Sequence, residues 1–182
     1  LDEIQSGNAR CGRYFAHQLQ DGTEFAIQPD VVTLAKALGN GIPIGACLAR
    51  GNAAQTFAPG NHGSTFGGNP FACNVASAVV TEIEEQQLAQ RATQLGEYLA
   101  TEFSNQLRGR DQFIDIRQQG LMIGIELDAD CSQLMMKGLD LGLVINVTAG
   151  NVVRLLPPLN MTDGEAEQLY KGVLSLIDTC LQ

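Results

Sequence analysis

The sequence predicts an α/β protein in two parts. Residues 1–80 are expected to form the C-terminal part of a large domain with a mostly parallel sheet. Residues 81–182 are expected to form an interdomain helix and a small α+β domain. Three observations support this division: short apolar runs separated by turns up to residue 49, apolar residues at helical spacing over 71–107, and paired strand-like runs from 113 onward.

The first part is expected to begin at the end of a buried strand, at Leu1 and Asp2, so we expect the chain to be the C-terminal part of a longer protein. Residues 31–34 are a β-branched run introduced by Pro29-Asp30, which is typical of a short buried strand. The other elements expected here are a loop at 3–12, short helices at 14–19 and 51–57, a strand at 44–49, a glycine-rich loop at 59–70 and a helix from about 71.

The second part reads as a long helix followed by short strands and two more helices. One apolar stripe predicts that the helix over 87–107 packs on a core; it consists of Leu88, Ala92, Leu95, Leu99 and Phe103. Strands are expected at 113–117, 121–127, 143–147 and 152–156, with a helix at 132–141. A capping box over 162–165 opens the last helix, whose inward residues are expected to be Leu169, Val173, Leu176, Ile177 and Cys180.

Composition limits the classes of function. The chain has 182 residues, of which 45% are hydrophobic and 17% charged, as in an ordinary globular protein. Its net charge of −9, without any basic cluster, argues against binding to nucleic acid or to an anionic membrane. No apolar run approaches the roughly 20 residues of a membrane span. Five scattered cysteines without C-x-x-C spacing indicate reduced thiols, a cytoplasmic protein and no metal site.

Lys36 lies between apolar residues directly after the strand expected at 31–34, and a glycine-rich turn follows it. A desolvated lysine loses its proton more readily and becomes a nucleophilic amine, the species that forms Schiff bases. The two other lysines, Lys137 and Lys171, fall in stretches that read as amphipathic helices, where a solvated lysine is ordinary. The alternative for Lys36 is a strand-end residue whose ammonium group reaches water.

Two further charged residues stand in apolar surroundings. Asp2, at the carboxyl end of a strand, is either the counter-charge of a protonated ring nitrogen or a carboxylate that caps a turn. Arg154 lies within an apolar strand and is followed by Pro157-Pro158. Its guanidinium suits bidentate capture of a carboxylate, whereas an arginine on an edge strand would point to solvent.

The loop over 59–70 contains four glycines and two prolines, and it places Ser64 and Thr65 next to glycine backbone. Such a loop can bring N–H groups and hydroxyls close to a phosphate, although a plain loop has the same composition. His62 is expected to be structural, and no Ser-His-Asp arrangement is indicated. A cysteine nucleophile is not indicated either, because four of the five cysteines lack a nearby base in sequence and Cys11 is flanked only by arginines.

Three motifs, in this order and spacing, resemble class III aminotransferases, which are pyridoxal-phosphate-dependent transferases of fold type I. They are residues 1–7 (LDEIQSG), Pro29-Asp30 leading to 35–39 (AKALG), and 62–70 (HGSTFGGNP). The resemblance covers the full length of the chain. Within the class, residues 150–160 (GNVVRLLPPLN) are most similar to the enzymes that use acetylornithine or succinylornithine.

The resemblance implies a role for each residue of these motifs. Lys36 would form the Schiff base with the cofactor, pyridoxal 5′-phosphate, and then move the proton between the substrate α-carbon and the cofactor C4′. Asp2 would pair with the pyridine nitrogen, and Gln5 would lie near the 3-oxygen. Thr65, with Ser64 beside it, would bind the phosphate of the neighbouring subunit's cofactor, which implies a homodimer with shared active sites. Arg154 would bind the α-carboxylate of glutamate or 2-oxoglutarate.

The resemblance further implies transfer of the amino group of N-acetylornithine to 2-oxoglutarate, in arginine biosynthesis. Another ω-amino transaminase, acting on succinylornithine, ornithine or 4-aminobutyrate, is the nearest alternative, and a catalytically inactive fragment is the alternative of a different class. The sequence departs from the family at Ala9, where these enzymes often have glycine. In the family, the half that would precede Leu1 supplies a phosphate-binding glycine loop, an aromatic residue stacked on the ring and a second carboxylate-binding arginine.

Overall fold

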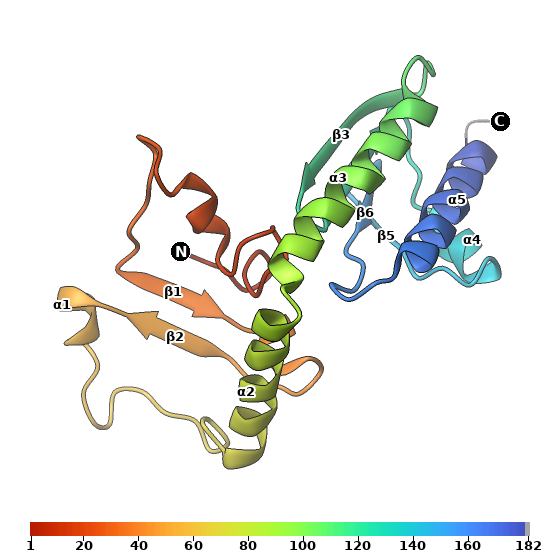
Figure 1. The fold of residues 1–182 in the computed structure, drawn as a ribbon. Helices are drawn as coiled ribbons and strands as arrows, with labels where there is room; N and C mark the ends of the chain where they lie inside the picture. Colours follow the sequence, from red (N-terminus) through yellow and green to blue (C-terminus); the bar gives the residue numbers. More distant parts are fainter. Residues whose placement is uncertain (181–182) are drawn as a thin grey trace. The chain divides into compact units, whose positions relative to one another are not determined.

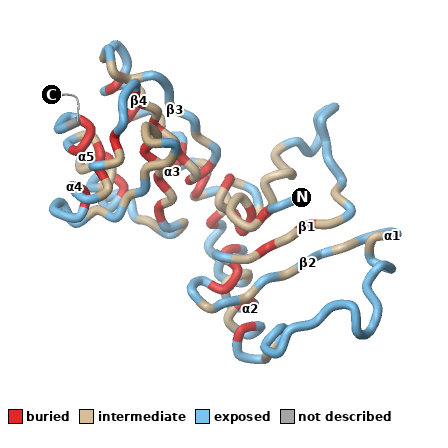
Figure 2. The backbone as a smooth tube through the Cα atoms, turned by 180° about the vertical axis from the view of Figure 1, so that it is seen from behind, coloured by how far each residue is buried: buried red, intermediate tan, exposed pale blue. Residues whose placement is uncertain are grey.

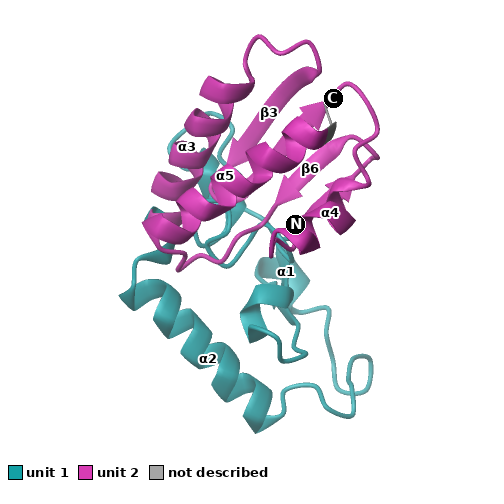
Figure 3. Ribbon diagram, turned by 90° about the vertical axis from the view of Figure 1, so that its right-hand side faces the viewer, with its two compact units in different colours: residues 1–90 teal, residues 91–182 magenta. Residues whose placement is uncertain are grey.

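The computed structural model describes residues 1–180, apart from the side chain of Cys180. The inward orientation expected for Cys180 therefore lies outside the described residues. The chain divides into two compact units, residues 1–90 (unit 1) and 91–182 (unit 2), shown in two colours in Figure 3. The expected domains at 1–80 and 81–182 stay a prediction about how the chain folds.

Unit 1 has short strands and one long helix. Its elements are the 3₁₀-helices η1 (Ala16–Gln20) and η2 (Lys36–Gly39), the strands β1 (Val31–Leu34) and β2 (Ala46–Ala49), and the helices α1 (Gly51–Ala54) and α2 (Pro70–Glu85) (Figure 1). The helices expected at 14–19, 51–57 and from about 71 and the strands expected at 31–34 and 44–49 are present, although β2 and α1 are shorter than expected. Helix α2 starts where the sequence favours it, because Asn69 Oδ1 accepts the Ala72 N–H at 3.0 Å and Pro70 occupies the first turn.

The sheet of unit 1 is small and mostly antiparallel in its described strands. β1 pairs antiparallel with β2, and the parallel contact is an isolated bridge between Asp2 and Thr33. Leu1 is 49% exposed, so the expectation that it ends a buried strand is wrong. Leu1 is not part of the apolar cluster of unit 1, in which Leu34 and Leu38 pack with Ala76 of α2.

Unit 2 is built on a four-stranded antiparallel sheet in the order β3-β4-β6-β5. Its strands are β3 (Phe113–Gln119), β4 (Met122–Leu127), β5 (Asn146–Thr148) and β6 (Val152–Leu155). Its helices are α3 (Leu88–Leu107), which begins just before the unit does, α4 (Leu134–Asp140) and α5 (Asp163–Cys180). The two central strands, β4 and β6, alternate buried and half-buried residues, as expected for a sheet with one face on the core.

One apolar cluster joins this sheet to its helices. Figure 2 shows buried stretches in red along α3, β4 and α5. All five residues of the stripe predicted on α3 are buried. Four of them, Ala92, Leu95, Leu99 and Phe103, belong to the cluster that also contains Ile123 and Ile125 of β4, Val153 of β6, and Val173 and Ile177 of α5. Each fully buried side chain of this kind contributes roughly 1.5–3 kcal/mol, so this cluster is the main source of stability in unit 2.

The capping box predicted at the start of α5 is present. The Thr162 N–H donates to Glu165 Oε2 at 2.8 Å, and the Glu165 N–H donates to Thr162 Oγ1 at 3.3 Å. The backbone hydrogen bond from Thr162, helped by its hydroxyl, lowers the pKa of Glu165. Across residues 1–180, none of the helices combines the length and the apolar character that crossing a membrane requires.

The turn between β5 and β6 contains a strained residue whose replacement is expected to stabilise unit 2. Ala149 is exposed and has φ +54°, a left-handed conformation that disfavours a Cβ atom. Ala149→Gly removes this strain at the expense of a solvent-exposed methyl group. We expect the free energy of unfolding to rise by about 0.5–1 kcal/mol, measured by urea denaturation. Ala129→Gly, at an exposed alanine outside the left-handed region, should give no gain.

Candidate active site

Asp2 and Lys36 lie at one edge of the sheet in unit 1. The Thr33 N–H donates to the Leu1 carbonyl and the Glu3 N–H donates to the Thr33 carbonyl, both at 3.0 Å, so the first residues run parallel to β1. Because parallel segments end at the same edge, Asp2 and Lys36 leave the sheet together. Open α/β sheets bind ligands at this carboxyl edge.

The Asp2 carboxylate also caps a turn. Its Oδ1 accepts the Ile4 N–H at 2.9 Å, which is the structural alternative that the sequence leaves open. This contact uses one carboxylate oxygen and leaves the other for a second partner. Gln5 is half-buried in the same turn. The turn therefore carries two of the three polar side chains expected around a pyridine ring.

Lys36 is exposed, and the prediction that it is desolvated is wrong for this structure. Lys36 is the first residue of η2 and has φ +49°; the buried residues on either side of it are Leu34 and Leu38. Lys36 follows the end of a two-stranded sheet. Its neighbours Leu34 and Leu38 are buried in the core, whereas the lysine side chain is exposed.

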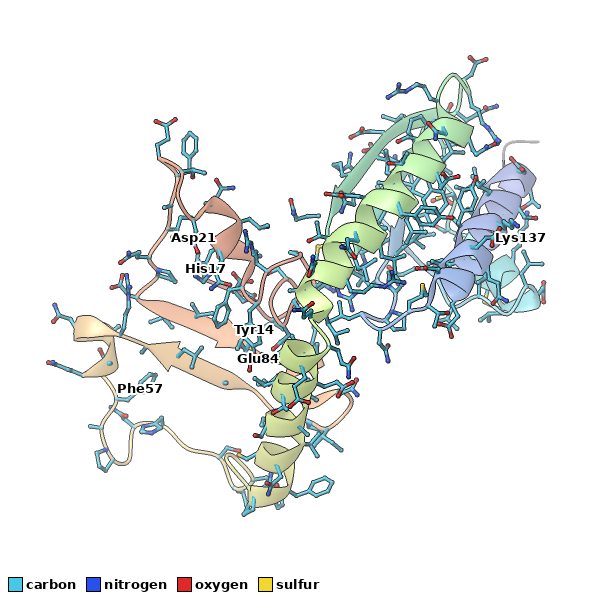
Figure 4. All side chains as sticks on the ribbon, in the orientation of Figure 1. Tyr14, His17, Asp21, Phe57, Glu84 and Lys137 are labelled. Atoms are coloured by element: carbon cyan, nitrogen blue, oxygen red, sulfur yellow. The ribbon has the colours of Figure 1, made fainter. Side chains whose placement is uncertain are left out.

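The other two lysines have partners that account for them. Lys137 is half-buried on α4, and its Nζ lies 3.4 Å from Thr179 Oγ1 (Figure 4). The Lys171 ammonium group is 2.6 Å from a carboxylate oxygen of Glu167, one helical turn away. Within the described residues, no ion pair of Lys36 is found. Its amine is therefore left available for chemistry.

The loop over 3–12 packs tightly against the end of β1. A Cβ atom at Gly7 would lie 2.6 Å from the Glu3 carbonyl oxygen and 2.9 Å from Leu34 Cδ2, so this position requires glycine. Ala9 is fully buried with φ +70°, in the left-handed region that costs a non-glycine residue about 1–2 kcal/mol. This conformation explains why the family often has glycine there. Asn8 is also fully buried, and its Nδ2 lies 3.5 Å from the Ala35 carbonyl oxygen.

Glu3 is a buried anchor of this loop that sequence reasoning did not single out. It is 2% exposed, and its carboxylate accepts hydrogen bonds from Ser6 Oγ at 2.7 Å and from the backbone N–H groups of Ala16 and His17 at 2.9 Å. His17 Nδ1 lies 3.0 Å from Glu3 Oε1. Burial by itself raises the pKa of Glu3, but these hydrogen bonds outweigh it and lower the pKa below its ordinary value.

Tyr14 lies in the segment that Glu3 holds, between the loop and η1. Its carbonyl oxygen accepts the Ala9 N–H at 3.3 Å. Burial raises the pKa of the Tyr14 hydroxyl, and the nearby carboxylate of Glu84 raises it further; Figure 4 labels both residues. Tyr14 therefore keeps its proton at neutral pH and carries no charge.

Ser64 and Thr65 lie in the exposed loop that precedes α2. Ser64, Gly67, Gly68 and Asn69 line one side of a cavity of about 320 Å³, and residues 43–45 line the other. Thr65 is exposed beside this cavity's lining. The loop therefore offers hydroxyl groups and backbone to solvent, as a phosphate-binding loop must.

Arg154 lies on β6 in unit 2, in a row of residues that the sheet aligns across its four strands: Arg117, Gly124, Arg154 and Asn146. Gly124 has no side chain to cover the guanidinium. Arg154 Nε is buried and has no hydrogen-bond partner among the described residues. A cavity of about 170 Å³ beside it has Pro157, Pro158 and Leu169 among its walls. An unpaired buried N–H of a guanidinium is the donor that a carboxylate would satisfy.

The residues present suit pyridoxal phosphate chemically. Unit 1 offers an accessible amine on Lys36 and a carboxylate on Asp2 at one edge, and hydroxyl groups on Ser64 and Thr65 in one loop. Unit 2 offers the unpaired Nε of Arg154. Among residues 1–180, no group of three or more His, Cys, Asp or Glu side chains could hold a metal ion.

Comparison with known proteins gives consistent matches. The chain is 47% identical over 182 residues to an acetylornithine aminotransferase of Nitrosomonas europaea, which covers 100% of the chain and 45% of that relative. Among solved structures, the chain resembles ornithine aminotransferase from Toxoplasma gondii, with a TM-score of 0.88 and 35% identity over 96% of this chain and 42% of that chain. That Toxoplasma gondii structure has pyridoxal phosphate (PLP) at partial occupancy in its active site. The chain also resembles acetylornithine aminotransferase from Elizabethkingia anophelis (TM-score 0.87, 34% identity, 97% and 44%).

The chain thus spans less than half the length of these relatives. These neighbours confirm the fold class expected from the sequence. The family model for class III aminotransferases matches residues 1–177, nearly the whole chain. The protein belongs to the class III aminotransferase family.

Proposed function

We propose that this chain is part of a pyridoxal-phosphate-dependent transaminase that moves the amino group of N-acetylornithine to 2-oxoglutarate, in arginine biosynthesis. The observation that carries the proposal is the placement of Lys36 and Asp2 at the carboxyl edge of parallel segments. The 47% identity to an acetylornithine aminotransferase supports the choice of amino donor.

Each residue has a distinct task in this reaction. When bound, pyridoxal phosphate supplies an aldehyde that bonds to an amine and a protonated ring that withdraws electrons from the substrate α-carbon. Lys36 supplies that amine and later takes the proton from the α-carbon and returns it. The negative charge of Asp2 keeps the ring nitrogen protonated. Gln5, in the same turn, can donate its side-chain amide to the ring oxygen.

Two further sites bind negative groups. Ser64 and Thr65 would bind the cofactor's phosphate through their hydroxyls and the adjoining backbone. We propose that they do so in a neighbouring subunit, so that a cytoplasmic homodimer has shared active sites. Arg154 would bind the α-carboxylate of glutamate or 2-oxoglutarate, because its Nε is buried without a partner. A net charge of −9 makes nucleic acid an unsuitable partner.

The first test is whether Lys36 bonds to the cofactor. The chain is mixed with pyridoxal phosphate, and the visible spectrum is recorded beside that of Lys36→Ala. We expect a band in the wild type that the variant lacks, because the two other lysines are engaged elsewhere. Equal spectra for the two proteins would contradict the proposal and favour a catalytically inactive fragment.

The amino donor is tested by half-reactions. Acetylornithine, succinylornithine, ornithine and 4-aminobutyrate are added separately to the cofactor-loaded protein, and loss of the visible band is timed. Acetylornithine is expected to discharge the band fastest. If ornithine or 4-aminobutyrate does so and acetylornithine does not, the protein is another ω-amino transaminase.

Arg154→Ala is expected to weaken the binding of glutamate about 100-fold and the binding of pyridoxal phosphate less than threefold. Loss of a charge-assisted carboxylate contact costs about 1.5–3 kcal/mol, equivalent to roughly 10- to 150-fold in affinity. Both dissociation constants are measured by spectral titration. Arg117→Ala is the matched control, because Arg117 is in the same row but is already paired with Glu126. Equal weakening of both ligands by Arg154→Ala would indicate a folding role instead.

A further inference from the structure

We propose that Asn8 is a positioning residue for Lys36. Its buried side-chain amide holds the peptide group between Ala35 and Lys36, and this peptide group sets the left-handed backbone of the lysine. The inference rests on the proposed function only in taking the Lys36 amine as the group that reacts with the cofactor. The backbone geometry itself is independent of any cofactor.

The contact reaches from the loop over 3–12 to the residue before Lys36. Asn8 Nδ2 donates to the Ala35 carbonyl oxygen at 3.5 Å, across 27 positions of the chain. The same oxygen accepts the Leu38 N–H at 3.0 Å, within the turn of η2. The Ala35 carbonyl carbon is bonded to the Lys36 nitrogen. Two donors on this oxygen therefore fix the plane from which the φ angle of Lys36 departs.

The lysine needs such support because its backbone is strained. A residue with a Cβ atom at φ +49° costs about 1–2 kcal/mol, and such conformations persist only where the surroundings hold them. The Leu38 hydrogen bond is local and belongs to the turn itself. Asn8 supplies a contact from outside the turn, so it is the part of the support that a single substitution can remove.

Asn8 is itself well anchored. Its neighbour Gly7 donates its N–H to the Glu3 carbonyl oxygen at 3.0 Å and packs on Leu34, and Ala9 donates to the Tyr14 carbonyl oxygen at 3.3 Å. Asn8 has φ +52°, a conformation that asparagine tolerates better than most residues. The segment that carries Asp2 and Gln5 thus also carries Asn8, which holds the peptide group before Lys36. One loop therefore sets the positions of Asp2, Gln5 and Lys36.

Stability alone does not account for an amide here. Asn8 is 0% exposed, and its Oδ1 has no hydrogen-bond partner among the described residues. A buried unsatisfied carbonyl costs about 1–3 kcal/mol, which an apolar side chain of similar size would avoid. An apolar residue would also lack the Nδ2 group that donates to the Ala35 carbonyl oxygen, and this hydrogen bond is therefore the reason for an amide at position 8.

The test compares Asn8→Gly with Ala9→Gly in the 182-residue chain. Glycine at position 8 keeps the left-handed backbone without strain and removes the side chain with its amide, and Ala9→Gly controls for the loss of a buried Cβ atom. Ala9 is the adjacent buried left-handed residue, and its side chain donates nothing. Two measurements are made: the backbone amide signals of Lys36 and Leu38 by ¹⁵N NMR, and the label on each lysine after pyridoxal phosphate and borohydride, by mass spectrometry.

We expect Asn8→Gly to shift the Lys36 and Leu38 amide signals and to lower the label on Lys36 about tenfold, the loss that corresponds to one hydrogen bond. Labelling of Lys137 and Lys171 stays constant, and Ala9→Gly changes neither measurement. A lower melting temperature with unchanged Lys36 signals and label would overturn the proposal, since it is what a merely structural residue gives.

Two further outcomes are separated. If wild-type Lys36 takes no more label than Lys137 and Lys171, the proposed function fails, and the amide signals alone decide the role of Asn8. If Asn8→Gly does not fold, Asn8→Ala replaces it, because alanine occupies the left-handed region at the adjacent position 9 and lacks the amide. Asn8→Ala is then expected to shift the Lys36 amide signal, and an unshifted signal in a folded protein overturns the proposal.

Discussion

Replacing Gly96 by alanine is expected to destabilise unit 2 by about 3 kcal/mol or more. A Cβ atom at this position would lie 1.9 Å from the Gly120 carbonyl oxygen and 2.6 Å from Gln118 Nε2. Inside a helix the same change normally stabilises by about 1 kcal/mol. Here the obstacle is a backbone oxygen in the tight turn between β3 and β4, which cannot rotate away, so overpacking outweighs the gain in helix propensity.

The measurement is urea denaturation, with hydrogen exchange of peptides from residues 91–180 to locate the change. Gly164→Ala is the matched control, because Gly164 lies in the first turn of α5 and its added Cβ would meet nothing within 4 Å. That variant should change the free energy of unfolding by between 0 and about +1 kcal/mol. A Gly96→Ala protein as stable as the wild type would mean that α3 does not approach the β3–β4 turn as described.

The sequence predicts the helices of this protein better than the environment of its charged residues. The stripe on α3 and the capping box of α5 are local patterns, set by residues three or four positions apart. The strands are predicted in order, but their limits differ by a few residues. β2 begins at Ala46 instead of Ile44, because pairing with β1 decides where this strand starts. The exposure of Leu1 depends on contacts with residues distant in sequence, and a local sequence pattern does not predict such contacts.

The candidate site shows the same division. The position of Lys36 just after a strand follows from the apolar run at 31–34, and the parallel bridge between Asp2 and Thr33 brings Asp2 to the same edge. The exposure of Lys36 does not follow, because it depends on which neighbours the core takes up. Glu3 and Asn8 were missed, since their partners at His17 and Ala35 lie 14 and 27 positions away. A glutamate directly after Asp2 in an apolar segment was the signal available for Glu3.

Glu3→Gln is expected to destabilise unit 1 by about 3 kcal/mol. The carboxylate is buried and accepts hydrogen bonds from Ser6 Oγ and from the N–H groups of Ala16 and His17. Glutamine has the same shape but offers one acceptor oxygen, and its NH₂ group would face N–H donors. Breaking a buried charged network costs about 3–5 kcal/mol when a partner is removed, and the isosteric change lies at the low end. Glu24→Gln, at an exposed glutamate, should stay within about 0.5 kcal/mol.

The pH dependence separates lost hydrogen bonds from lost packing. The pKa of Glu3 is lower in the folded chain than its ordinary value, so the unfolded state binds the proton more readily. The stability from this carboxylate is therefore complete above the unfolded pKa of about 4.3 and is lost as the pH falls through the lower folded pKa. We expect the gap in unfolding free energy between wild type and Glu3→Gln, measured by urea denaturation with hydrogen exchange over residues 1–90, to be constant from pH 5 to 7 and to narrow below about pH 4. If the difference in unfolding free energy is the same at pH 3 and pH 7, the destabilisation by Glu3→Gln comes from lost packing and not from the lost charge of Glu3.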